Sequence, residues 1–498
     1  MARRPGEPSC AHGENGDGDE LEKGDAVDED GFPLVLRRAR VLLATDSLGP
    51  VNGVSRTTRS LIEYLTRHGV DLVVVAPRHE SRVGLEEATV NNMTIRLPGC
   101  LLPYYPDLTI VYPFRLDRLA VPPGWQADLI YLASPASVGF PLLTQIRQLH
   151  RPPPVLLNFQ TDLSSYSEIV LPPLLARGAV ALLGLVQGIL FRHASVHTVF
   201  YPCSDIGRYL DGTGVPRDRM VRLGRGVDTV LFHPRRRDDA YRRQLAPNGE
   251  TILICVCRLG LEKGLDFLAR VAVQLAAAAL PFKLLIVGGN RNPAVEDDLR
   301  RRFEPVKDRV VFAGFLTGES LARAYAVGDL FLHCSITETF GLVVLEAMAS
   351  GVPVIARDRG GPSDIVCHEK TGYLEDPNDV GRFVQRIREV SSDPDRRARL
   401  STAARQFAEG TTWEKINRRV AEQLADALPA RRVPAPSPFH APVADHEDVP
   451  GPVQRWAEQL RMYAAMGLIW VVWTISVVPL LMHGHRAFGQ RQPKRRES

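Results

Sequence analysis

Apolar runs of strand length alternate with helical patterns along most of the chain. In the first half, apolar runs lie at 40–45, 71–77, 128–133 and 154–159, with a helical pattern at 57–68. A second set of apolar runs lies at 251–259, 282–289, 309–315, 329–334 and 352–357. Strands that alternate with helices predict a parallel sheet with helices on both faces. The two sets therefore predict an α/β protein with two doubly wound, Rossmann-like domains.

A stretch rich in charges and turn formers at 231–250 separates the two sets. We expect an N-terminal domain at 37–230, an interdomain linker at 231–250 and a C-terminal domain at 251–430. Doubly wound sheets bind their ligands beyond the carboxyl ends of the strands. Two such domains that face each other predict a cleft, and we expect the chemistry to take place in it.

The two ends of the chain differ from this body. Residues 1–30 carry ten acidic side chains against three basic ones, so we expect 1–36 to be a disordered acidic tail. Residues 431–452 are rich in proline and predict a semi-rigid linker. Residues 462–482 contain no charged side chain, and a helix of this length spans about 31 Å, enough for a bilayer core of about 30 Å. We expect a transmembrane anchor and a basic tail at 453–498, with a membrane hairpin or an in-plane helix as the alternative.

Composition narrows the classes of function. The 498 residues carry a formal net charge of +4, and bases are interleaved with acids, unlike the basic stripe of a nucleic-acid-binding protein. The seven cysteines form no Cys-x-x-Cys pair, so neither a disulfide framework nor a zinc site is indicated. Several lie in apolar runs, where cysteine behaves as a small apolar residue. Because the N-terminus lacks the apolar segment of a secretory signal, we expect a reducing, cytosolic catalytic body.

The most informative segment is SITETFGLVVLEAMASGVPVIARDRGGPSDIV, which begins at Ser335. It predicts a polar loop after a strand and then a helix that begins near Gly341. The start of a helix aims backbone amides at a ligand, so Phe340, Gly341 and Leu342 are candidates for binding phosphate or sugar oxygens.

Two acids of this segment can contact different parts of one ligand. Glu338 precedes the helix, whereas Glu346 lies in its second turn. The helix is otherwise apolar, and a buried acid needs a partner or a ligand.

Arg258 and Lys263 lie just beyond a predicted strand and at the start of the next helix. Two cations beside a helix N-terminus are suited to a diphosphate, because arginine can bind it bidentately and the helix dipole adds to both charges. Gly53, in the glycine loop that follows the first strand, would let the backbone approach a ligand closely.

Other features favour structural roles. His193 and His197 lie outside any identified site. Asp393 and Asp395 match an Asp-x-Asp pattern but lie in a polar turn between helices, so no catalytic metal is expected. The apolar stretch 171–191 predicts a helix of the N-terminal domain, either packed in the core or exposed to lipid at the rim of the cleft.

Several motifs along the chain resemble those of one known family. RLGLEKG, TETFGLVVLEAMASGVPVIA and GGPSDIV resemble glycosyltransferase family four, whose GT-B fold has two Rossmann-like domains, over residues 38–425. LASPASVGF, FQTDLSSY and GRGVDTVLFHP resemble the branch with GDP-mannose-dependent α-mannosyltransferases and sulfoquinovosyltransferases. The resemblance implies retaining transfer of a sugar from a nucleoside diphosphate to an acceptor hydroxyl.

The resemblance also implies roles for residues of this chain. Arg258 and Lys263 would neutralise the leaving diphosphate, Glu338 would hold sugar hydroxyls and Glu346 the ribose. Gly53 and the amides at 340–342 would contact phosphate or sugar.

One position departs from the family pattern. Many members have a histidine where this chain has Gln160, and glutamine cannot act as a proton donor or base. Gln160 and Asp162 are therefore candidates only for holding the acceptor.

These inferences predict a membrane-attached glycosyltransferase on the cytosolic face of an internal membrane such as the endoplasmic reticulum. It would transfer a hexose, from GDP-mannose or another nucleotide sugar, to a lipid or lipid-like acceptor, without a cofactor. A UDP-sugar-dependent sulfoquinovosyl- or glucosyltransferase is the alternative within the enzyme class. The membrane-bound N-acetylglucosaminyltransferase subunit of glycolipid-anchor synthesis fits the motifs less well. A non-catalytic membrane scaffold is the alternative from another class.

Overall fold

The computed structural model describes residues 27–49, 52–78, 93–102, 105–112, 114–162, 173–290 and 293–428, together with four single residues between 456 and 467. The expected acidic tail up to residue 26, the proline-rich linker and nearly all of the expected membrane anchor lie outside these residues. None of the helices in the described ranges is long and apolar enough to cross a membrane.

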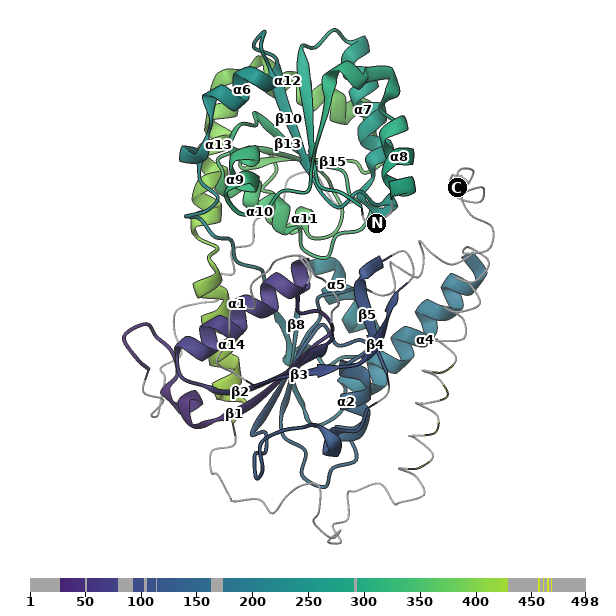
Figure 1. The fold of residues 1–498 in the computed structure, drawn as a ribbon, viewed down its shortest axis with the longest axis vertical. Coiled ribbons are helices and arrows are strands. Elements are labelled where there is room, and N and C mark those ends of the chain that lie inside the picture. The colour runs from purple at the N-terminus through teal and green to yellow at the C-terminus, as the bar shows by residue number, and fades with distance from the viewer. Residues whose placement is uncertain are drawn as a thin grey trace.

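Two α/β domains lie one above the other, and each is built on a parallel sheet (Figure 1). The N-terminal sheet has the order β3-β2-β1-β6-β7-β8-β9, and the C-terminal sheet has the order β12-β11-β10-β13-β14-β15. The N-terminal strands are β1 (Arg40–Thr45), β2 (Asp71–Pro77), β3 (Met93–Leu97), β6 (Leu129–Ala133), β7 (Val155–Asn158), β8 (Val196–Tyr201) and β9 (Met220–Arg222), with a separate hairpin of β4 (Gly99–Leu102) and β5 (Tyr105–Val111). The C-terminal strands are β10 (Thr251–Val256), β11 (Phe282–Val287), β12 (Val310–Gly314), β13 (Leu330–His333), β14 (Val354–Arg357) and β15 (Gly372–Glu375).

Helices cover both faces of each sheet (Figure 1). The N-terminal domain has α1 (Gly53–Arg67), α2 (Gly139–Ile146), α4 (Pro173–Phe191) and α5 (Ser204–Gly212). The C-terminal domain has α6 (Asp239–Leu245), α7 (Leu265–Ala277), α8 (Pro293–Arg301), α9 (Gly318–Ala326), α10 (Leu342–Ala349), α11 (Pro362–Ile365), α12 (Val380–Ser392) and α13 (Pro394–Glu409), and α14 (Trp413–Asp426) follows. Short 3-10 helices lie at Leu34–Arg38, Leu116–Arg118, Arg217–Arg219, Pro234–Arg236, Leu261–Lys263 and Glu304–Arg309.

The strands are apolar on both sides because both faces of the sheet are buried. Val41 and Leu43 of β1 share a core cluster with α1, whereas Leu42 and Ala44 belong to the cluster on the opposite face. Such near-continuous apolar runs are typical of parallel sheets covered by helices. The expected strands at 40–45 and 71–77 are confirmed at their bounds, and the others begin or end within a few residues of the prediction. The apolar stretch at 171–191 forms α4 from Pro173 onward.

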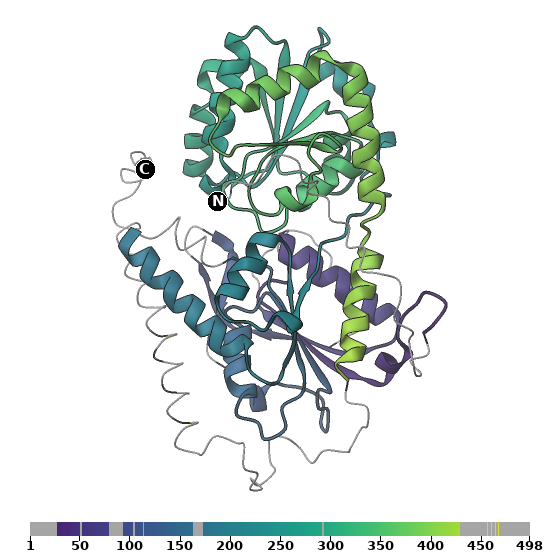
Figure 2. The same cartoon turned by 180° about the vertical axis from the view of Figure 1, so that it is seen from behind.

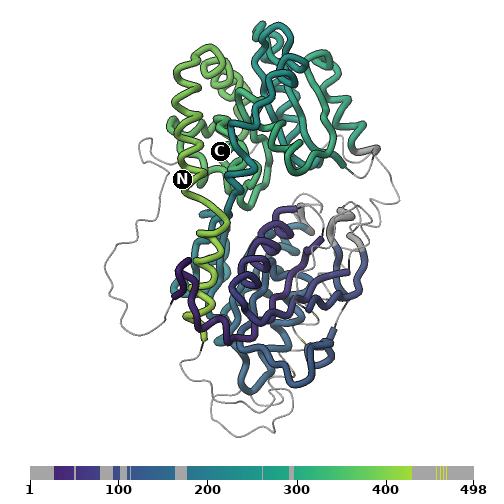
Figure 3. Tube along the Cα trace, turned by 60° about the vertical axis from the view of Figure 1, so that its left-hand side comes forward, coloured from purple at the N-terminus to yellow at the C-terminus, as the bar shows by residue number. Residues whose placement is uncertain are grey.

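The last helix returns to the N-terminal domain, which corrects the predicted C-terminal domain boundary at 430. Figures 2 and 3 show the chain near its yellow-green end passing from the upper domain to the lower one. Val420 and Leu424 are buried in the cluster that contains α1, and Asn417 donates from Nδ2 to the Ser60 carbonyl at 3.1 Å. Helical periodicity identifies the buried stripe of α14 but does not say which sheet it covers.

The two segments that cross between the domains lie side by side. The Val227 amide donates to the Thr411 carbonyl at 3.0 Å. A Cβ atom on Gly226 would lie 2.2 Å from the Trp413 nitrogen, so glycine is required where these segments meet.

Two other predicted boundaries are also corrected. Residues 27–36 belong to the N-terminal domain rather than to the tail, because Phe32 and Leu36 are fully buried beside α1 and the Phe32 ring stacks on His68 at 4.2 Å. The expected linker 231–250 belongs to the C-terminal domain, because Phe232 and Leu245 are buried in its core. In both segments the apolar residues are isolated among charged ones, so the sequence shows no strand or helix pattern that would assign either segment to a domain.

The described cysteines are mostly free. Cys203, Cys255 and Cys334 are buried thiols inside the domains, consistent with cysteine acting as a small apolar residue. Cys367 is disulfide-bonded, although the cysteine spacing did not indicate a disulfide framework.

Truncation of Leu424 tests the assignment of α14 to the N-terminal core. Leu424 is fully buried, so Leu424→Ala should lower the free energy of unfolding of the N-terminal domain by about 2–5 kcal/mol, measured by urea denaturation. Arg419→Ala, on the exposed side of the same helix, should change it by less than about 0.5 kcal/mol. Equal effects of the two variants would show that α14 does not complete this core.

Candidate active site between the domains

Each sheet has one point where the strand order reverses, between β1 and β6 and between β10 and β13. Loops that leave adjacent strands in opposite directions open a crevice at such a point, and ligands of doubly wound folds bind there. In this chain the described parts of these loops are 46–49 and 52, 134–138, 257–264 and 334–341. In Figure 1, α1 of the lower domain faces α10 and α11 of the upper one. The predicted candidates at 53, 258, 263, 338 and 340–342 lie in or beside these loops.

Two loops of the C-terminal domain touch each other and form the centre of the site. Gly264 has a φ of +66°, and a Cβ atom on it would lie 1.9 Å from the Cys334 carbonyl oxygen. The Ile336 amide donates to the Glu262 carbonyl at 2.8 Å. Only glycine permits this approach, which brings the side chains at 263 and 338 together.

Lys263 and Glu338 form an ion pair in this centre. The Lys263 Nζ donates to Glu338 Oε2 at 3.0 Å, and His333 Nε2 lies 3.8 Å from the same oxygen. Burial alone would raise the pKa of Glu338, but the Lys263 ammonium and His333 hold it well below its ordinary value. Glu338 is therefore a carboxylate at neutral pH and can accept hydrogen bonds from hydroxyls.

The GGPSDIV motif holds the loop that carries Glu338. The Gly361 amide donates to the Glu338 carbonyl at 2.8 Å. A Cβ atom on Gly360 would lie 2.3 Å from that carbonyl oxygen, and one on Gly361 would lie 2.0 Å from the Phe340 oxygen. The two glycines thus fix the backbone that leads into α10.

Arg258 lies on the same loop as Lys263. Its Nη2 is 3.5 Å from Glu262 Oε1, and the Glu262 side chain is 2% exposed whereas that of Arg258 is 34% exposed. The guanidinium is therefore partly exposed beside a buried carboxylate, where it is accessible to another anion.

Two helices, one from each domain, begin beside each other. Gly341 has a φ of +99° and leads into α10, which begins at Leu342 as predicted. A Cβ atom on Gly53, the first residue of α1, would lie 3.6 Å from Leu342 Cδ1. The positive ends of both helix dipoles therefore lie in the same region, which favours an anion.

Glu346 is placed differently from the other predicted ligands. Its side chain is 2% exposed, Oε1 is ion-paired with Arg56 Nη1 of the N-terminal domain, and Oε2 accepts from the Tyr325 hydroxyl at 2.8 Å. The Glu346 carboxylate raises the pKa of Arg56, and burial together with this carboxylate raises that of Tyr325. Sequence reasoning missed both partners, although Arg56 lies three residues after Gly53 in the same loop-to-helix turn.

On the acceptor side, the structure brings Gln160 next to the loop of Glu338. The Thr339 hydroxyl donates to the Gln160 carbonyl at 3.0 Å. Gln160 is 6% exposed, and its side-chain Nε2 has no hydrogen-bond partner among the described residues. Asp162, two residues further on, is half-buried.

Asp46 organises the N-terminal wall of the site and was also missed. Its carboxylate accepts from the Ala136 and Val138 amides at 2.8 Å and from the Ser137 hydroxyl at 2.7 Å. Burial raises the pKa of Asp46 to about 6, although these hydrogen bonds favour the charged form. The sequence could have identified Asp46 as a site residue from its position directly after the first predicted strand.

Arg225, in the GRGVD motif, is buried close to Phe340 of the C-terminal domain. It is 3% exposed, and Nη2 donates to Asn158 Oδ1 at 3.2 Å while Nη1 donates to two backbone carbonyls. Burial lowers its pKa to about 10, so it remains a cation. The guanidinium also lies 5.9 Å from the Phe340 ring centroid and thereby connects the two domains.

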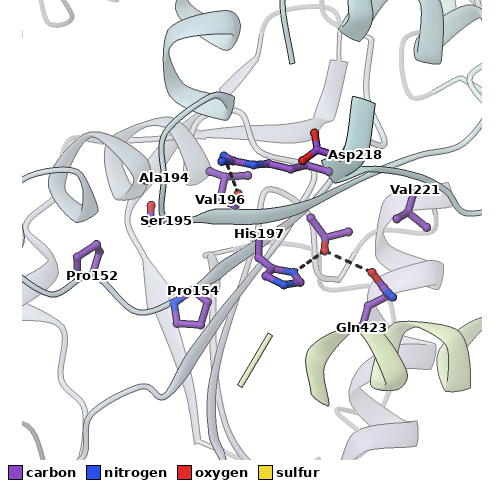
Figure 4. Close-up of a pocket in the computed structure, with 11 residues that line it drawn as sticks. Pro152, Pro154, Ala194, Ser195, Val196, His197, Asp218, Val221 and Gln423 are labelled. Carbon is purple, nitrogen blue, oxygen red and sulfur yellow. Dashed lines mark hydrogen bonds between the residues drawn. The ribbon is translucent and has the colours of Figure 1, made fainter. Parts of the chain in front are cut away.

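A surface pocket of about 530 Å³ lies elsewhere, at the amino ends of β7 and β8 (Figure 4). His197 lies there and is hydrogen-bonded to Thr198 at 2.9 Å, and His193 is bonded to Ser195 at 2.8 Å. Asp393 caps α13 by accepting from the Arg396 amide. None of these three residues reaches the interdomain site.

Comparisons with known proteins agree with this geometry. Residues 52–226 match the family "Glycosyl transferase 4-like domain", and residues 237–407 match "Glycosyl transferases group 1". The chain is 33% identical to a GDP-mannose-dependent alpha-mannosyltransferase of Mycobacterium tuberculosis, over 76% of this chain and 94% of the relative. It is 30% identical to a sulfoquinovosyl transferase of Arabidopsis thaliana, over 79% of this chain and 74% of the relative.

Solved structures show the same fold at lower identity. Sucrose-phosphate synthase from Thermosynechococcus elongatus superposes with a TM-score of 0.62 at 23% identity, over 78% of this chain and 98% of the other. The Anabaena protein HepE in complex with UDP-glucose gives 0.62 at 19% identity, over 78% and 99%. Two family models match most of the chain, and the identity to the mycobacterial relative extends over nearly its whole length. Together with the two facing Rossmann-like domains, these matches show that the chain belongs to the group 1, family four glycosyltransferases and has the GT-B fold.

Proposed function

We propose that this glycosyltransferase transfers mannose from GDP-mannose, with retention of configuration, to the hydroxyl of a lipid or another membrane-associated acceptor. The observation that best supports a nucleotide-sugar donor is the Lys263–Glu338 ion pair. This pair lies beside Arg258, where α1 and α10 begin. This arrangement offers cations to a diphosphate and a carboxylate to the hydroxyls of a hexose. Identity of 33% to the mycobacterial enzyme supports mannose and guanosine as the specific choices.

The proposed chemistry places positive charge where negative charge develops. As the bond between the anomeric carbon and the β-phosphate oxygen breaks, charge accumulates on the departing diphosphate. Lys263 and Arg258 would stabilise that charge more strongly in the transition state than in the ground state, and this difference is what accelerates the reaction. The two adjacent helix N-termini would act in the same direction.

The remaining groups would orient the sugar and the acceptor. Glu338 would accept hydrogen bonds from sugar hydroxyls, and the Gln160 amide, which has no partner in the described part of the chain, would donate to the acceptor oxygen. That oxygen bonds to the anomeric carbon, and its proton passes to the departing phosphate oxygen. No protein base is then needed at residue 160, consistent with a glutamine there.

Three observations support a lipid acceptor. A phosphatidylinositol monomannoside mannosyltransferase of Mycolicibacterium smegmatis is 32% identical over 44% of this chain. The helix α4 is apolar, and Leu185 on it is 57% exposed. The uncharged stretch 462–482 is long enough to cross a bilayer, and such an anchor would hold the catalytic body at the membrane surface, which we propose is the cytosolic one.

A UDP-sugar donor is the second candidate. It is favoured by the 30% identity to the sulfoquinovosyl transferase, which covers 79% of this chain. The mannose and sulfoquinovose alternatives share the diphosphate site and differ in the nucleobase and sugar.

Nucleotide discrimination separates the candidates. In thermal-shift experiments on the full-length chain, GDP at a hundredfold excess over its Kd should raise the melting temperature by about 5–10 °C, because it binds only the folded state. UDP and ADP should have no such effect. A shift with UDP alone would favour the second candidate, and no shift with any nucleotide would contradict the proposed function.

Substitutions in the ion pair test the proposed roles. Lys263→Ala and Glu338→Gln should each lower kcat/KM for mannosyl transfer by about 10²- to 10³-fold, because the diphosphate and the sugar lose a charged partner. Lys283→Ala is the matched control, since Lys283 lies at the amino end of β11 and donates only to the Asp308 carbonyl in the described structure. Unchanged turnover in either site variant, measured with radiolabelled GDP-mannose, would refute the role assigned to that residue.

A further inference from the structure

The cleft contains three cation–carboxylate pairs rather than free cations. In each pair a lysine or arginine holds a carboxylate that is at most 19% exposed. Two pairs lie within the C-terminal domain, and the third crosses from one domain to the other. The pairs are Lys263–Glu338, Arg258–Glu262 and Arg56–Glu346. Their charges balance, so the cleft between the domains has no net charge from these six side chains.

The third pair is the one that joins the domains. Arg56 lies in the first turn of α1, and Glu346 lies in α10, 290 residues further along the chain. Arg56 holds one carboxylate oxygen of Glu346 and the Tyr325 hydroxyl holds the other. Each oxygen accepts one hydrogen bond, and the Glu346 side chain is 2% exposed, so a ligand can reach the carboxylate only if a group packed against it moves.

Arg56 is the donor that can move. Tyr325 is fully buried and its ring packs edge-on against Phe232 at 5.6 Å, which fixes its hydroxyl. The Arg56 side chain is 34% exposed and extends from a helix N-terminus at the cleft. A buried carboxylate that loses its cation needs replacement donors, and the two hydroxyls of a ribose diol supply them.

We propose that Arg56 is a donor-responsive cation that exchanges partners when the nucleotide sugar binds. The ribose diol takes Glu346, and the released guanidinium binds the donor diphosphate at the start of α1. This inference rests on the proposed function and extends it, because it assigns a diphosphate ligand to the acceptor-side domain. Both halves of the exchange need a complete nucleotide, which carries a diol and a diphosphate.

The exchange makes a prediction that a purely structural role does not. Arg56 competes with the nucleoside for Glu346 but attracts the diphosphate. Arg56→Met should therefore weaken GDP binding by at least about tenfold, while guanosine binding stays the same or becomes tighter. Isothermal titration calorimetry of the full-length chain with GDP and with guanosine measures both quantities, and UDP and uridine serve if the chain prefers uracil.

Further variants control for folding. Arg56→Met leaves Glu346 buried without its cation, so the double variant Arg56→Met/Glu346→Gln, which removes both charges, is compared with Glu346→Gln alone and should bind GDP at least tenfold more weakly than that single variant. Arg56→Lys keeps the charge and should retain GDP affinity within about threefold. Arg67→Met, at the other end of α1 and 62% exposed, should leave both affinities unchanged.

The outcomes separate this inference from the proposed function. Equal losses for GDP and guanosine in Arg56→Met would assign Arg56 to holding Glu346 alone, and unchanged GDP affinity would remove it from the diphosphate site. Either result overturns the exchange and leaves the proposed function standing. A wild-type chain that binds neither GDP nor UDP overturns both.

Discussion

The ion pair between Lys263 and Glu338 is the interaction on which the site depends. It forms because the backbone at Gly264 passes against the Cys334 carbonyl, an approach that any side chain at 264 would prevent. This contact joins the loop after β10 to the loop after β13 at the point where the strand order reverses. The doubly wound topology therefore creates the crevice, and a single glycine contact places a cation and a carboxylate together inside it.

The ion pairs of the site contribute little to folding stability, and their role is to prepare charged groups for a ligand. Partly buried ion pairs gain little net free energy over apolar packing, because desolvation offsets the attraction. Lys263, Arg258 and Arg56 nevertheless stay next to carboxylates that orient them before a ligand arrives. A diphosphate that enters can replace those carboxylates, and the carboxylates are then available to hydroxyls. Such preorganised charge needs little rearrangement during the reaction.

The sequence was sufficient for the fold and for the residues that follow strands directly. Apolar runs located most of the strands of both sheets, and their ends placed Arg258, Lys263 and Glu338 at one edge. Contacts between distant segments were not predictable. Arg56 pairs with a residue 290 positions away, Asp46 binds amides about 90 positions away, and α14 covers the first domain although it follows the second. Local periodicity carries no information about such partners, because they are chosen by tertiary packing.

The most direct measurement is an experimental structure of the full-length chain with GDP bound. The account predicts that the diphosphate lies between α1 and α10, with its oxygens at hydrogen-bond distance, about 3 Å, from Lys263 Nζ and the Arg258 guanidinium. A nucleotide bound elsewhere, or one in the cleft whose diphosphate contacts neither residue, would contradict it.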